Sequence, residues 1–522
     1  MSDATDRRAR IAAVEKAFAI LEQFGPDAPE LRIADLAADA GMNRSSAQRL
    51  VHTLLKGGWL NRDASETLLS LSHRAADPAF VYLSSNQLME LVLPFAVELN
   101  ARTALSCDLW LKAESSMVTL ARIPSPASSL ALAPVGTTVA LTGSAPGRAL
   151  ISALPQESFD ETLAELRSPA SEIAADLVET LQNERQAGYA QDFDYGSGAG
   201  KVIAAAFRGA DGEPVGALTL SGFTDETAGQ KASALLRDTI SNINGLRVAV
   251  AARPTTSDPG SHVIRPLPDS ENDPLEIAAV SKTLHLLQFF YPHKPLLTLT
   301  ELSRVTGFPV PTVQRITDTL IGLGYLAKDE RKRAFHISTR SLDLMYRFQM
   351  SNDLVRSVWP RLVRFREECG LRCSFCILDG TEIVHLLHIQ SRPDPDFRTA
   401  YPGRRFLAAA SSGGRAMLSW LPPEETWDIL QNSSIEPLTA HTVTDKEAVF
   451  KEIRNASARG VAFTDRQSVR DELNVAAAVR GPDGRPLGAM VVSAPARTWT
   501  IERLEKEVVP SLLSHSRSGT MY

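Results

Sequence analysis

The stretch LTELSRVTGFPVPTVQRI, residues 299–316, decides the fold. Leu299, Leu302 and Val305 recur at helical spacing, and a second apolar series follows Gly307. Apolar residues at i, i+3 and i+4 on both sides of a glycine turn are typical of two short helices that cross. Glycine suits this turn because it adopts a positive φ without steric cost. With the strand-like segment and charged tip that follow, the stretch predicts a winged helix-turn-helix.

The same pattern occurs earlier in the chain. Residues 11–60 align without a gap on 277–326, at a constant offset of 266, and 18 of the 50 pairs are identical. Later motifs repeat as well: PGRAL (146–150) with GGRAM (413–417), and ADGEPVGALTLS (210–221) with PDGRPLGAMVVS (482–493). Self-similarity of this kind indicates that one unit of roughly 250 residues is duplicated.

The chain of 522 residues is too long for one core, since a domain usually has roughly 100–200 residues. Each unit is predicted to be α+β, with a winged helix-turn-helix, a connecting helix, and a sheet flanked by helices. The predicted boundaries are 1–75 (winged helix), 76–252 (connecting helix and sheet domain), 253–275 (proline-rich linker), 276–341 (second winged helix) and 342–522 (second connecting helix and sheet domain).

Composition excludes several protein classes. The chain has no run of 18 apolar residues, so no membrane span is expected, and its polar N-terminus predicts no secretory signal. Four cysteines do not make a disulfide framework. We therefore expect a cytoplasmic protein. No motif indicates catalysis, a metal or a cofactor, and Cys373 and Cys376 are interpreted as core cysteines.

The net charge of −6 hides an asymmetry between the two winged helices. Residues 1–60 hold eight basic and eight acidic side chains, whereas 277–345 hold nine basic and five acidic ones. Three of those basic residues, Arg331 to Arg333, form the predicted wing tip. Such a run alone is as often a solvated hairpin tip. Beside a helix-turn-helix it indicates contact with DNA.

The second helix of each predicted helix-turn-helix carries polar side chains opposite its apolar face. In the major groove of DNA, arginine reads guanine and glutamine reads adenine most effectively. His52 is interpreted as a solvated helix residue. The predicted DNA-binding residues are Arg44, Ser45, Ser46, Gln48 and Arg49 in the first unit, and Thr312, Gln314, Arg315, Arg331, Lys332 and Arg333 in the second.

Both units resemble the isocitrate lyase regulator (IclR) family of bacterial transcription factors. The first motif is L-x-x-x-T-G-x-x-x-x-T-x-x-R-x-x-x-x-L-x-x-x-G-Y, from Leu302 to Tyr325, with its counterpart from Leu36 to Trp59. The others are the Gly-Arg-Ala helix followed by Leu-Pro, a Gly-aromatic-Ala or Gly-Val-Ala segment, and the late Asp-Gly turn. The resemblance covers nearly the whole chain, twice.

The resemblance implies a winged helix-turn-helix, a linker helix and a GAF-like effector domain in each unit. It also implies that the effector domain binds a small organic acid, aromatic acids included, and so modulates DNA binding. The acid is expected at the N-terminus of the Gly-Arg-Ala helix, where unpaired N–H groups attract an anion. The implied ligand residues are Ser412, Gly413, Asp465 and Ser493 in the second unit, and Ala145, Asp192 and Ser221 in the first, with Asp194 as the alternative to Asp192.

Each unit departs from the family pattern at a different place. Pro146 lacks the N–H that Gly413 offers, while Val310-Pro311 replaces the polar pair Arg44-Ser45. In the second unit Val491 replaces the late-strand hydroxyl that the first unit keeps as Thr219. We therefore expect the units to have divided the work of binding DNA and ligand.

The duplication predicts a pseudo-dimer within one chain. We expect the winged helices to pair through their first helices, 11–24 and 277–290, and to read an imperfect palindrome of double-stranded DNA, because the recognition helices differ. Chains can pair further, since the family commonly forms tetramers. The alternative prediction is a ligand-sensing or protein-interaction regulator that has lost specific DNA binding. An enzyme is not expected.

Overall fold

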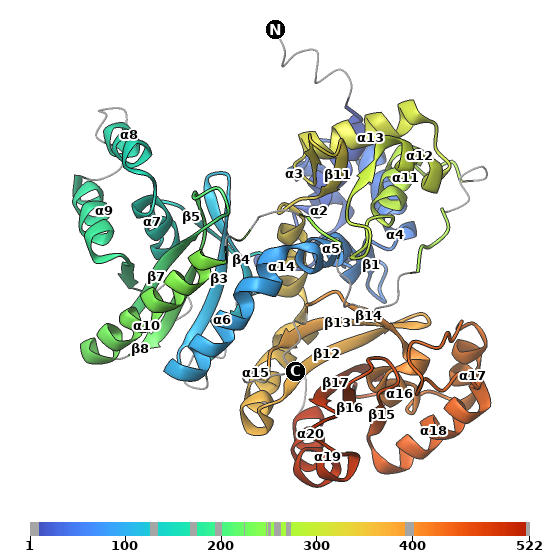
Figure 1. The fold of residues 1–522 in the computed structure, drawn as a ribbon. Coiled ribbons are helices and arrows are strands. Elements are labelled where there is room, and N and C mark those ends of the chain that lie inside the picture. Colours follow the sequence, from blue (N-terminus) through green and yellow to red (C-terminus); the bar gives the residue numbers. More distant parts are fainter. Residues whose placement is uncertain are drawn as a thin grey trace.

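The computed structural model describes residues 10–125, 134–166, 175–193, 201–223, 225–246, 248, 252–254, 263–267, 273–391 and 401–517. Two winged helices lie together at one end of the molecule, with the linker helices beneath them and the two effector domains on separate sides (Figure 1). The predicted α+β fold in two copies is confirmed. Residues 1–9 and most of the predicted linker 253–275 lie outside the described residues.

The two winged helices contain corresponding elements. The first comprises α2 (Ala12–Leu21), α3 (Ile33–Asp39), α4 (Arg44–Lys56), β1 (Leu60–Arg62) and β2 (Leu69–Leu71). The second comprises α11 (Ala278–Leu287), β9 (Leu297–Thr298), α12 (Leu299–Thr306), α13 (Val310–Gly322), β10 (Leu326–Asp329) and β11 (Ala334–Ile337). The predicted recognition helices are α4 and α13.

Local chemistry fixes the ends of the helices in the deciding stretch. Thr298 caps α12 and exchanges hydrogen bonds with Glu301, so two N–H groups at the helix start are satisfied. Gly307 ends α12 with a φ of +71°, the left-handed conformation expected for this glycine. Pro311 lies in the first turn of α13, where a missing N–H costs nothing.

An asparagine divides each linker into two helices. The connecting helix predicted at the start of 76–252 is two helices, α5 (Asp77–Ser85) and α6 (Gln87–Thr103). Asn86 has an extended backbone between them, and its side chain accepts a hydrogen bond from the N–H of Leu88. Asn352 separates α14 (Ser341–Ser351) from α15 (Asp353–Cys369) in the same way.

Each effector domain is built on a six-stranded antiparallel sheet of identical strand order, β5-β4-β3-β8-β7-β6 in the first and β14-β13-β12-β17-β16-β15 in the second. The first sheet consists of β3 (Ser106–Ala113), β4 (Ser116–Ile123), β5 (Thr138–Ala140), β6 (Ala190–Phe193), β7 (Lys201–Arg208) and β8 (Pro214–Phe223). The second consists of β12 (Arg372–Asp379), β13 (Glu382–Ile389), β14 (Arg405–Leu407), β15 (Ala462–Asp465), β16 (Glu472–Arg480) and β17 (Pro486–Pro495).

Helices cover these sheets. The first domain has α7 (Ala145–Ser152), α8 (Gln156–Leu166), α9 (Ala175–Ala187) and α10 (Glu226–Gly245). The second has η2 (Ala408–Ala410), α16 (Ser412–Leu418), α17 (Pro423–Gln431), α18 (Lys446–Arg459), α19 (Ile501–Glu507) and α20 (Val509–Ser516). Among the described helices none is both long and apolar enough to cross a membrane.

Reciprocal contacts join the two winged helices. The N–H of Ile11 donates to Oγ1 of Thr319, and the N–H of Ile277 donates to Oγ1 of Thr53, both at 3.0 Å. These pairs are equivalent under the offset of 266, so they relate the two halves by a pseudo-two-fold. Both threonine side chains are fully buried. The hydrogen bonds therefore fix the N-terminus of each first helix against the recognition helix of the other unit.

The linker helices also cross between units. A Cβ on Gly136 would lie 2.1 Å from the carbonyl oxygen of Leu342 in α14, and a Cβ on Gly403 would lie 2.5 Å from the Cβ of Phe80 in α5. Both glycines have a positive φ. In each effector domain a glycine turn, next to β5 or β14, thus packs closely against the linker helix of the other unit. The two units are intertwined rather than arranged in series.

Candidate nucleic-acid interface and effector site

The recognition helix α4 presents its predicted residues to solvent. Asn43 caps the helix by accepting a hydrogen bond from the N–H of Ser46 at 2.8 Å. Arg44, Ser45, Gln48 and Arg49 are exposed, and Ser46 is half-buried. Ala47, Leu50, Val51 and Leu54 form the buried face. The helix therefore holds the predicted set on a single polar surface.

The recognition helix α13 presents a different surface. Gln314 and Arg315 are exposed and Thr312 is half-buried. Pro309 occupies the N-cap position and makes no side-chain cap, and the exposed Val310 stands where the first unit has Arg44. The two helices thus differ most in the first turn, which in helix-turn-helix proteins contacts base edges.

The wings differ as expected. Arg331, Lys332 and Arg333 are exposed at the turn between β10 and β11. In the first unit the turn is instead organised by Asp63, whose carboxylate accepts hydrogen bonds from the N–H groups of Thr67 and Leu68. Those hydrogen bonds, together with one from Ser65, lower the pKa of Asp63. Only the second wing offers a cationic tip for phosphates.

An acidic segment lies along the C-terminal half of α4, and it was not predicted from the sequence. Asp273 contacts Nε2 of His52 at 2.8 Å and Nζ of Lys56 at 3.1 Å, and Glu276 contacts the same lysine at 2.6 Å. The carbonyl of Glu276 also accepts from Nη2 of Arg49 at 3.4 Å. At the corresponding position beside α13, the basic residue Arg10 lies against Gly322. His52 is therefore partnered, not simply solvated.

The second effector domain contains a cavity of about 30 Å³ at the N-terminus of α16. Three predicted ligand residues, Ser412, Gly413 and Ser493, line it. The N-cap Ser411 accepts a hydrogen bond from Gly414 at 3.1 Å, and Ser493 donates to Asn474 at 2.6 Å. A Cβ on Gly413 would lie 2.7 Å from Sγ of Cys376, so this position requires glycine.

Two histidines face this cavity because of a β-bulge. His385 and His388 are three residues apart, a spacing that places side chains on opposite faces of a regular strand. In the register of β12 and β13, Phe375 pairs with Leu387 and Cys376 with His385, so Leu386 is an extra residue. Both rings consequently line the cavity, stacked with centroids 4.8 Å apart.

The cavity holds buried polar atoms without partners. Nδ1 of His385, both ring nitrogens of His388 and Oγ1 of Thr464 make no hydrogen bond to any described residue. Burial, with Arg404 and Arg372 nearby, lowers the pKa of His385 to about 3, and burial also lowers the pKa of His388. Buried polar atoms usually have partners, so this cluster indicates a place for a polar ligand.

The structure separates one predicted ligand residue from the others. Asp465 does not line the cavity, because the preceding residue of β15, Thr464, faces it instead. The Asp465 carboxylate instead contacts Nε of Arg466 at 2.7 Å, and this hydrogen bond lowers the pKa of Asp465. Arg372, Arg404, His385 and His388 were not predicted. The sequence holds one indication of this site, because Arg372 is a charged residue in the mostly apolar strand RCSFCIL.

In the first effector domain, different side chains stand at the corresponding strand positions. Trp110, the counterpart of Cys376, is buried, and its Nε1 donates to Oγ1 of Thr219 at 3.1 Å. Asp108, the counterpart of Ser374, is buried beside Thr219 and 3.6 Å from Nε of Arg122. Burial raises the pKa of Asp108. A buried indole and carboxyl leave little place for an anion.

Of the predicted ligand residues of the first unit, the structure describes Ala145, Asp192 and Ser221, whereas Asp194 lies outside the described residues. Ala145 and Ser221 are buried. The Asp192 carboxylate accepts a hydrogen bond from Nη1 of Arg148 at 3.1 Å, and the same guanidinium contacts Glu184. Asp192 therefore contributes to holding α7 on the sheet. Arg415 has the equivalent role in the second unit, with Glu452 and Gln467 as partners.

Comparison with protein families gives matches in both halves. The IclR helix-turn-helix domain matches residues 13–64 and 279–330, and the bacterial transcriptional regulator IclR C-terminal domain matches residues 80–244 and 348–518. Together these matches cover most of the chain. The predicted resemblance is confirmed.

Curated relatives match one unit at a time. The chain is 26% identical over 245 residues to the Pca regulon regulatory protein of Pseudomonas putida, covering 47% of this chain and 84% of that protein. It is 22% identical over 230 residues to the transcriptional repressor IclR of Escherichia coli K12, covering 44% and 84%. A crystal structure of a transcriptional regulator from Rhodococcus sp. RHA1 matches with 27% identity and a TM-score of 0.42, covering 46% and 95%.

Proposed function

Because this chain belongs to the IclR family of bacterial transcriptional regulators, we propose that both of its recognition helices bind one operator, and that a small organic acid in the second effector domain modulates this binding. The pairing of the winged helices within one chain carries the proposal. It replaces the two-fold of a homodimer by the reciprocal hydrogen bonds of Thr53 and Thr319.

The operator is an imperfect palindrome. A symmetric protein reads two identical half-sites, and here the half-sites face different side chains. Arg44 and Ser45 open α4, whereas Val310 and Pro311 open α13. We expect the first half-site to be defined by base contacts of α4, and the second by phosphate contacts of the basic wing together with Gln314 and Arg315. In vitro selection of binding sites that returned perfectly symmetric sequences would contradict this.

The acid binds in the second effector domain only. Ser412, Gly413 and Ser493 lie in its cavity beside Arg372, Arg404 and the two unpartnered histidines. The volume of about 30 Å³ holds roughly two water molecules, since one needs about 10–15 Å³. This favours an acid of two to four carbons over an aromatic ring. In the first unit Trp110 and Asp108 stand where the second has Cys376 and Ser374, so we expect Ala145, Asp192 and Ser221 to have a structural role.

The test is fluorescence anisotropy on the DNA upstream of its own gene, at several salt concentrations, with a panel of short-chain and aromatic acids. We expect sequence-dependent binding that falls steeply with salt, by about 0.9 log units per decade for each phosphate neutralised. One short acid shifts the affinity. Replacing Arg49 or Arg315 by alanine weakens binding unequally, and each variant is compared with scrambled DNA as its control.

A second candidate is a regulator that senses a ligand or a protein without specific DNA binding. One observation favours it: the carboxylates of Asp273 and Glu276 pair with Lys56 at the end of α4, and the backbone carbonyl of Glu276 accepts a hydrogen bond from Arg49. Binding that is weak, equal on scrambled DNA and unaffected by every acid would support this candidate over the first.

A further inference from the structure

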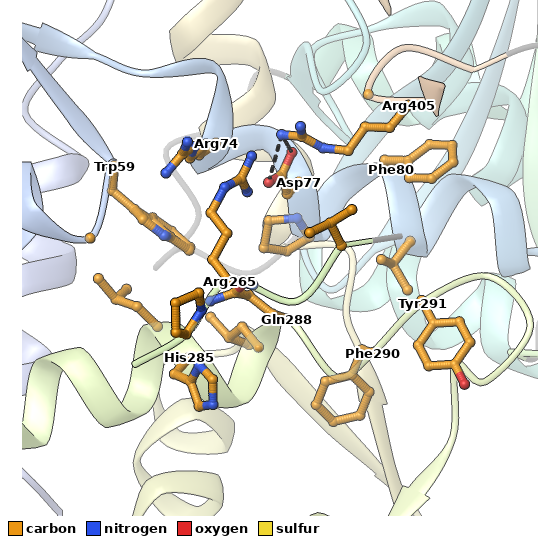
Figure 2. A pocket seen from close by; sticks show the side chains of 18 of the residues that line it. Trp59, Arg74, Asp77, Phe80, Arg265, His285, Gln288, Phe290, Tyr291 and Arg405 are labelled. Atoms are coloured by element: carbon orange, nitrogen blue, oxygen red, sulfur yellow. Dashed lines mark hydrogen bonds and ion pairs between the residues drawn. The ribbon is translucent and has the colours of Figure 1, made fainter. Parts of the chain in front are cut away.

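A cavity of about 140 Å³ lies between the winged helices and the second effector domain. Figure 2 shows its lining, which comes from five separate stretches of the chain. The first unit contributes Trp59 and α5, and the second contributes α11 with the loop after it. The tether segment 263–267 and the turn before β14 complete the wall. The cavity thus touches both DNA-binding units and one effector domain.

The size and walls of this cavity suit a single aromatic ring. A cavity of about 150 Å³ lined by apolar side chains binds benzene in a well-studied engineered protein. Here the rings of Trp59, Phe80, Phe290 and Tyr291 surround a similar space (Figure 2). Aromatic rings pack favourably on one another in edge or offset arrangements. The effector cavity, at about 30 Å³, offers no such room.

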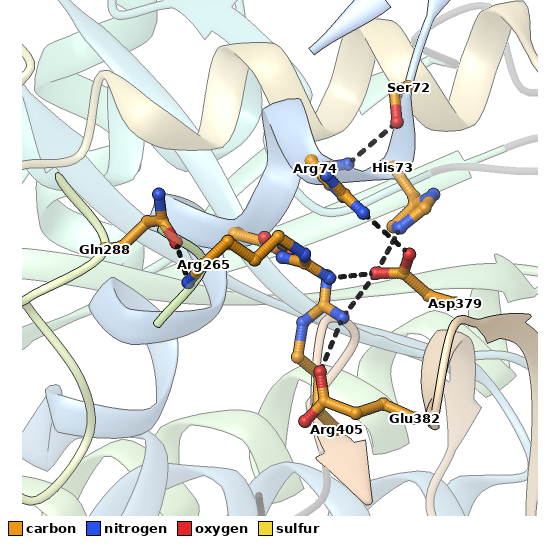
Figure 3. Close-up of polar contacts among 9 residues, drawn as sticks. Ser72, His73, Arg74, Arg265, Gln288, Asp379, Glu382 and Arg405 are labelled. Atoms are coloured by element: carbon orange, nitrogen blue, oxygen red, sulfur yellow. Dashed lines mark hydrogen bonds and ion pairs between the residues drawn. The ribbon is translucent and has the colours of Figure 1, made fainter. Parts of the chain in front are cut away.

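One wall of the cavity is cationic. Arg74, Arg265 and Arg405 line it, and all three contact the carboxylate of Asp379 (Figure 3). Nε2 of His73 lies 3.0 Å from the same carboxylate. The hydrogen bond from His73 and the charges of the arginines hold the pKa of Asp379 far below its usual range.

Two of the three arginines on this wall, Arg74 and Arg265, retain hydrogen-bonding capacity. Arg405 is fully engaged, because it also pairs with Asp77 and Glu382. Arg74 and Arg265 each contact Asp379 through Nη2 alone. A guanidinium has five N–H donors, so both arginines keep donors for a further acceptor. Arginine binds carboxylates particularly well because two parallel donors match the two oxygens.

The pseudo-two-fold provides an internal comparison, because the equivalent place on the other side is closed. There the hydroxyl of Tyr325 donates to Glu22 at 2.8 Å, and Arg340 contacts the same carboxylate at 3.0 Å. Arg347 crosses the space and donates to the carbonyls of Glu22 and Phe24.

On the open side, three substitutions remove these contacts. Trp59 replaces Tyr325, Gln288 replaces Glu22 and Val81 replaces Arg347, at the offset of 266. The carboxylate and the arginine that cross the closed side are both absent. Arg74, the counterpart of Arg340, turns instead to Asp379. The cavity therefore arises from specific differences between the two units.

We propose that this cavity is a second ligand site, which binds a single-ring aromatic carboxylate. The ring packs among Trp59, Phe80 and Phe290, and the carboxylate accepts hydrogen bonds from Arg74 and Arg265. A bound molecule contacts both winged helices and the turn at Gly403, so it holds the DNA-binding pair on the second effector domain. Binding to this cavity is independent of the proposed function, and only its effect on DNA rests on that function.

The test uses the full chain and benzoate as the probe, by isothermal titration calorimetry. The closing variant combines Trp59→Tyr, Val81→Arg and Gln288→Glu, which reproduces the closed side and leaves the net charge unchanged. We expect wild type to bind benzoate, and the closing variant to bind it at least about tenfold more weakly, a loss of about 1.4 kcal/mol. Circular dichroism and thermal melting establish that the variant is folded.

A matched variant separates this site from the effector cavity. Arg372→Met alters the effector cavity, and we expect it to leave benzoate binding within about twofold of wild type. Wild type that binds no benzoate would overturn the proposal. Benzoate binding that Arg372→Met abolishes and the closing variant retains would overturn it as well, because the ring would then occupy the effector domain. Neither result depends on DNA.

A spectroscopic measurement keeps the proposal testable if the closing variant does not fold. Nitroaromatic acids quench tryptophan fluorescence on contact, and Trp59 is the tryptophan that lines this cavity. We expect 4-nitrobenzoate to quench wild type saturably and Trp59→Phe substantially less, with Trp427→Phe as the control. Equal quenching of Trp59→Phe and wild type would contradict the site.

Discussion

Arg404 and Arg405 are consecutive residues whose side chains line different cavities. Arg404 lines the effector cavity of the second unit, and Arg405 lines the cavity beneath the winged helices. Both are buried at the start of β14. A ligand that displaces Arg404 therefore acts on a backbone whose next side chain is paired to Asp77 of the first linker helix. This is a short physical connection between the effector domain and the DNA-binding pair.

Asp77→Asn tests this connection. Arg405 keeps Asp379 and Glu382 as partners, and Asp77 is about one-third exposed, so we expect a stability loss of no more than about 1 kcal/mol. Acid binding, measured by calorimetry, should stay near that of wild type. The change in DNA affinity that the acid produces should shrink severalfold. An undiminished response would show that the signal takes another route.

Asp379→Asn should destabilise the protein much more. The change leaves His73, Arg74, Arg265 and Arg405 without the carboxylate they share, at a side chain that is 9% exposed. Breaking a buried ion pair typically costs about 3–5 kcal/mol. Urea unfolding measures the loss. The control is Glu507→Gln, which breaks the exposed ion pair of Arg503 and Glu507 and should lower the free energy of unfolding by about 0.5 kcal/mol or less.

A double-mutant cycle gives the sharper test of the same cluster. Arg265→Met should cost less in an Asp379→Asn background than in wild type, because the interaction it removes is already gone. Additive losses would show that Arg265 and Asp379 do not interact in solution.

Thr53→Val and Thr319→Val should have similar effects. Each substitution removes the hydroxyl oxygen that accepts one hydrogen bond between the two winged helices. The donor, which is the backbone N–H of Ile277 or Ile11, then lacks this acceptor. We expect each variant to lose about 1–3 kcal/mol of unfolding free energy. Chemical denaturation followed by circular dichroism measures it. A large loss in one variant and none in the other would contradict the pseudo-two-fold.

The histidine pair predicts a pH dependence of stability. Burial lowers the folded-state pKa of His385 to about 3, whereas an unfolded histidine titrates near pH 6.5. Between these values the unfolded chain binds more protons, so stability is full above about pH 6.5 and falls as the pH is lowered towards 3. Urea unfolding at pH 7.5 and pH 5 measures this, and the variant His385→Gln/His388→Gln should lose less stability than wild type on acidification. An identical loss would contradict the assignment.

Ser493 and Ser221 form a matched pair for the proposed division of ligand binding. They occupy equivalent positions in β17 and β8, paired with Arg372 and Ser106 in the neighbouring strands. Ser493→Ala should weaken binding of the short acid severalfold, and Ser221→Ala should leave it unchanged, because Trp110 and Asp108 stand in the first domain where the second has Cys376 and Ser374. Calorimetry on both variants measures the difference. Equal effects would show that both effector domains bind.

Much of the architecture was predictable because it depends on local chemistry. The duplication, the glycine turn at Gly307 and the recognition helices follow from periodicity and from a constant offset. The ligand positions Ser412, Gly413 and Ser493 came from the family resemblance, and all three line the cavity. What remained out of reach depends on register and on packing between units.

Three particulars show why. One extra residue, Leu386, turns His385 and His388 to the same face, and no strand periodicity reveals a bulge. Asp465 was predicted as a ligand residue, but the preceding residue of the same strand, Thr464, faces the cavity instead. The acidic pair that lies on α4 belongs to a segment more than 200 residues away in sequence, and a helix pattern contains no information about such a neighbour.

The reciprocal threonine hydrogen bonds join segments of one polypeptide, and this changes how the protein responds to dilution. Two subunits that must find each other dissociate as their concentration falls, whereas tethered halves keep a fixed effective concentration. The occupancy of an operator should therefore rise in simple proportion to the number of chains in a cell at low abundance, without the squared dependence of a dissociating dimer. Because the two halves are encoded by separate parts of one gene, each half can also mutate alone. In a homodimer every mutation changes both subunits.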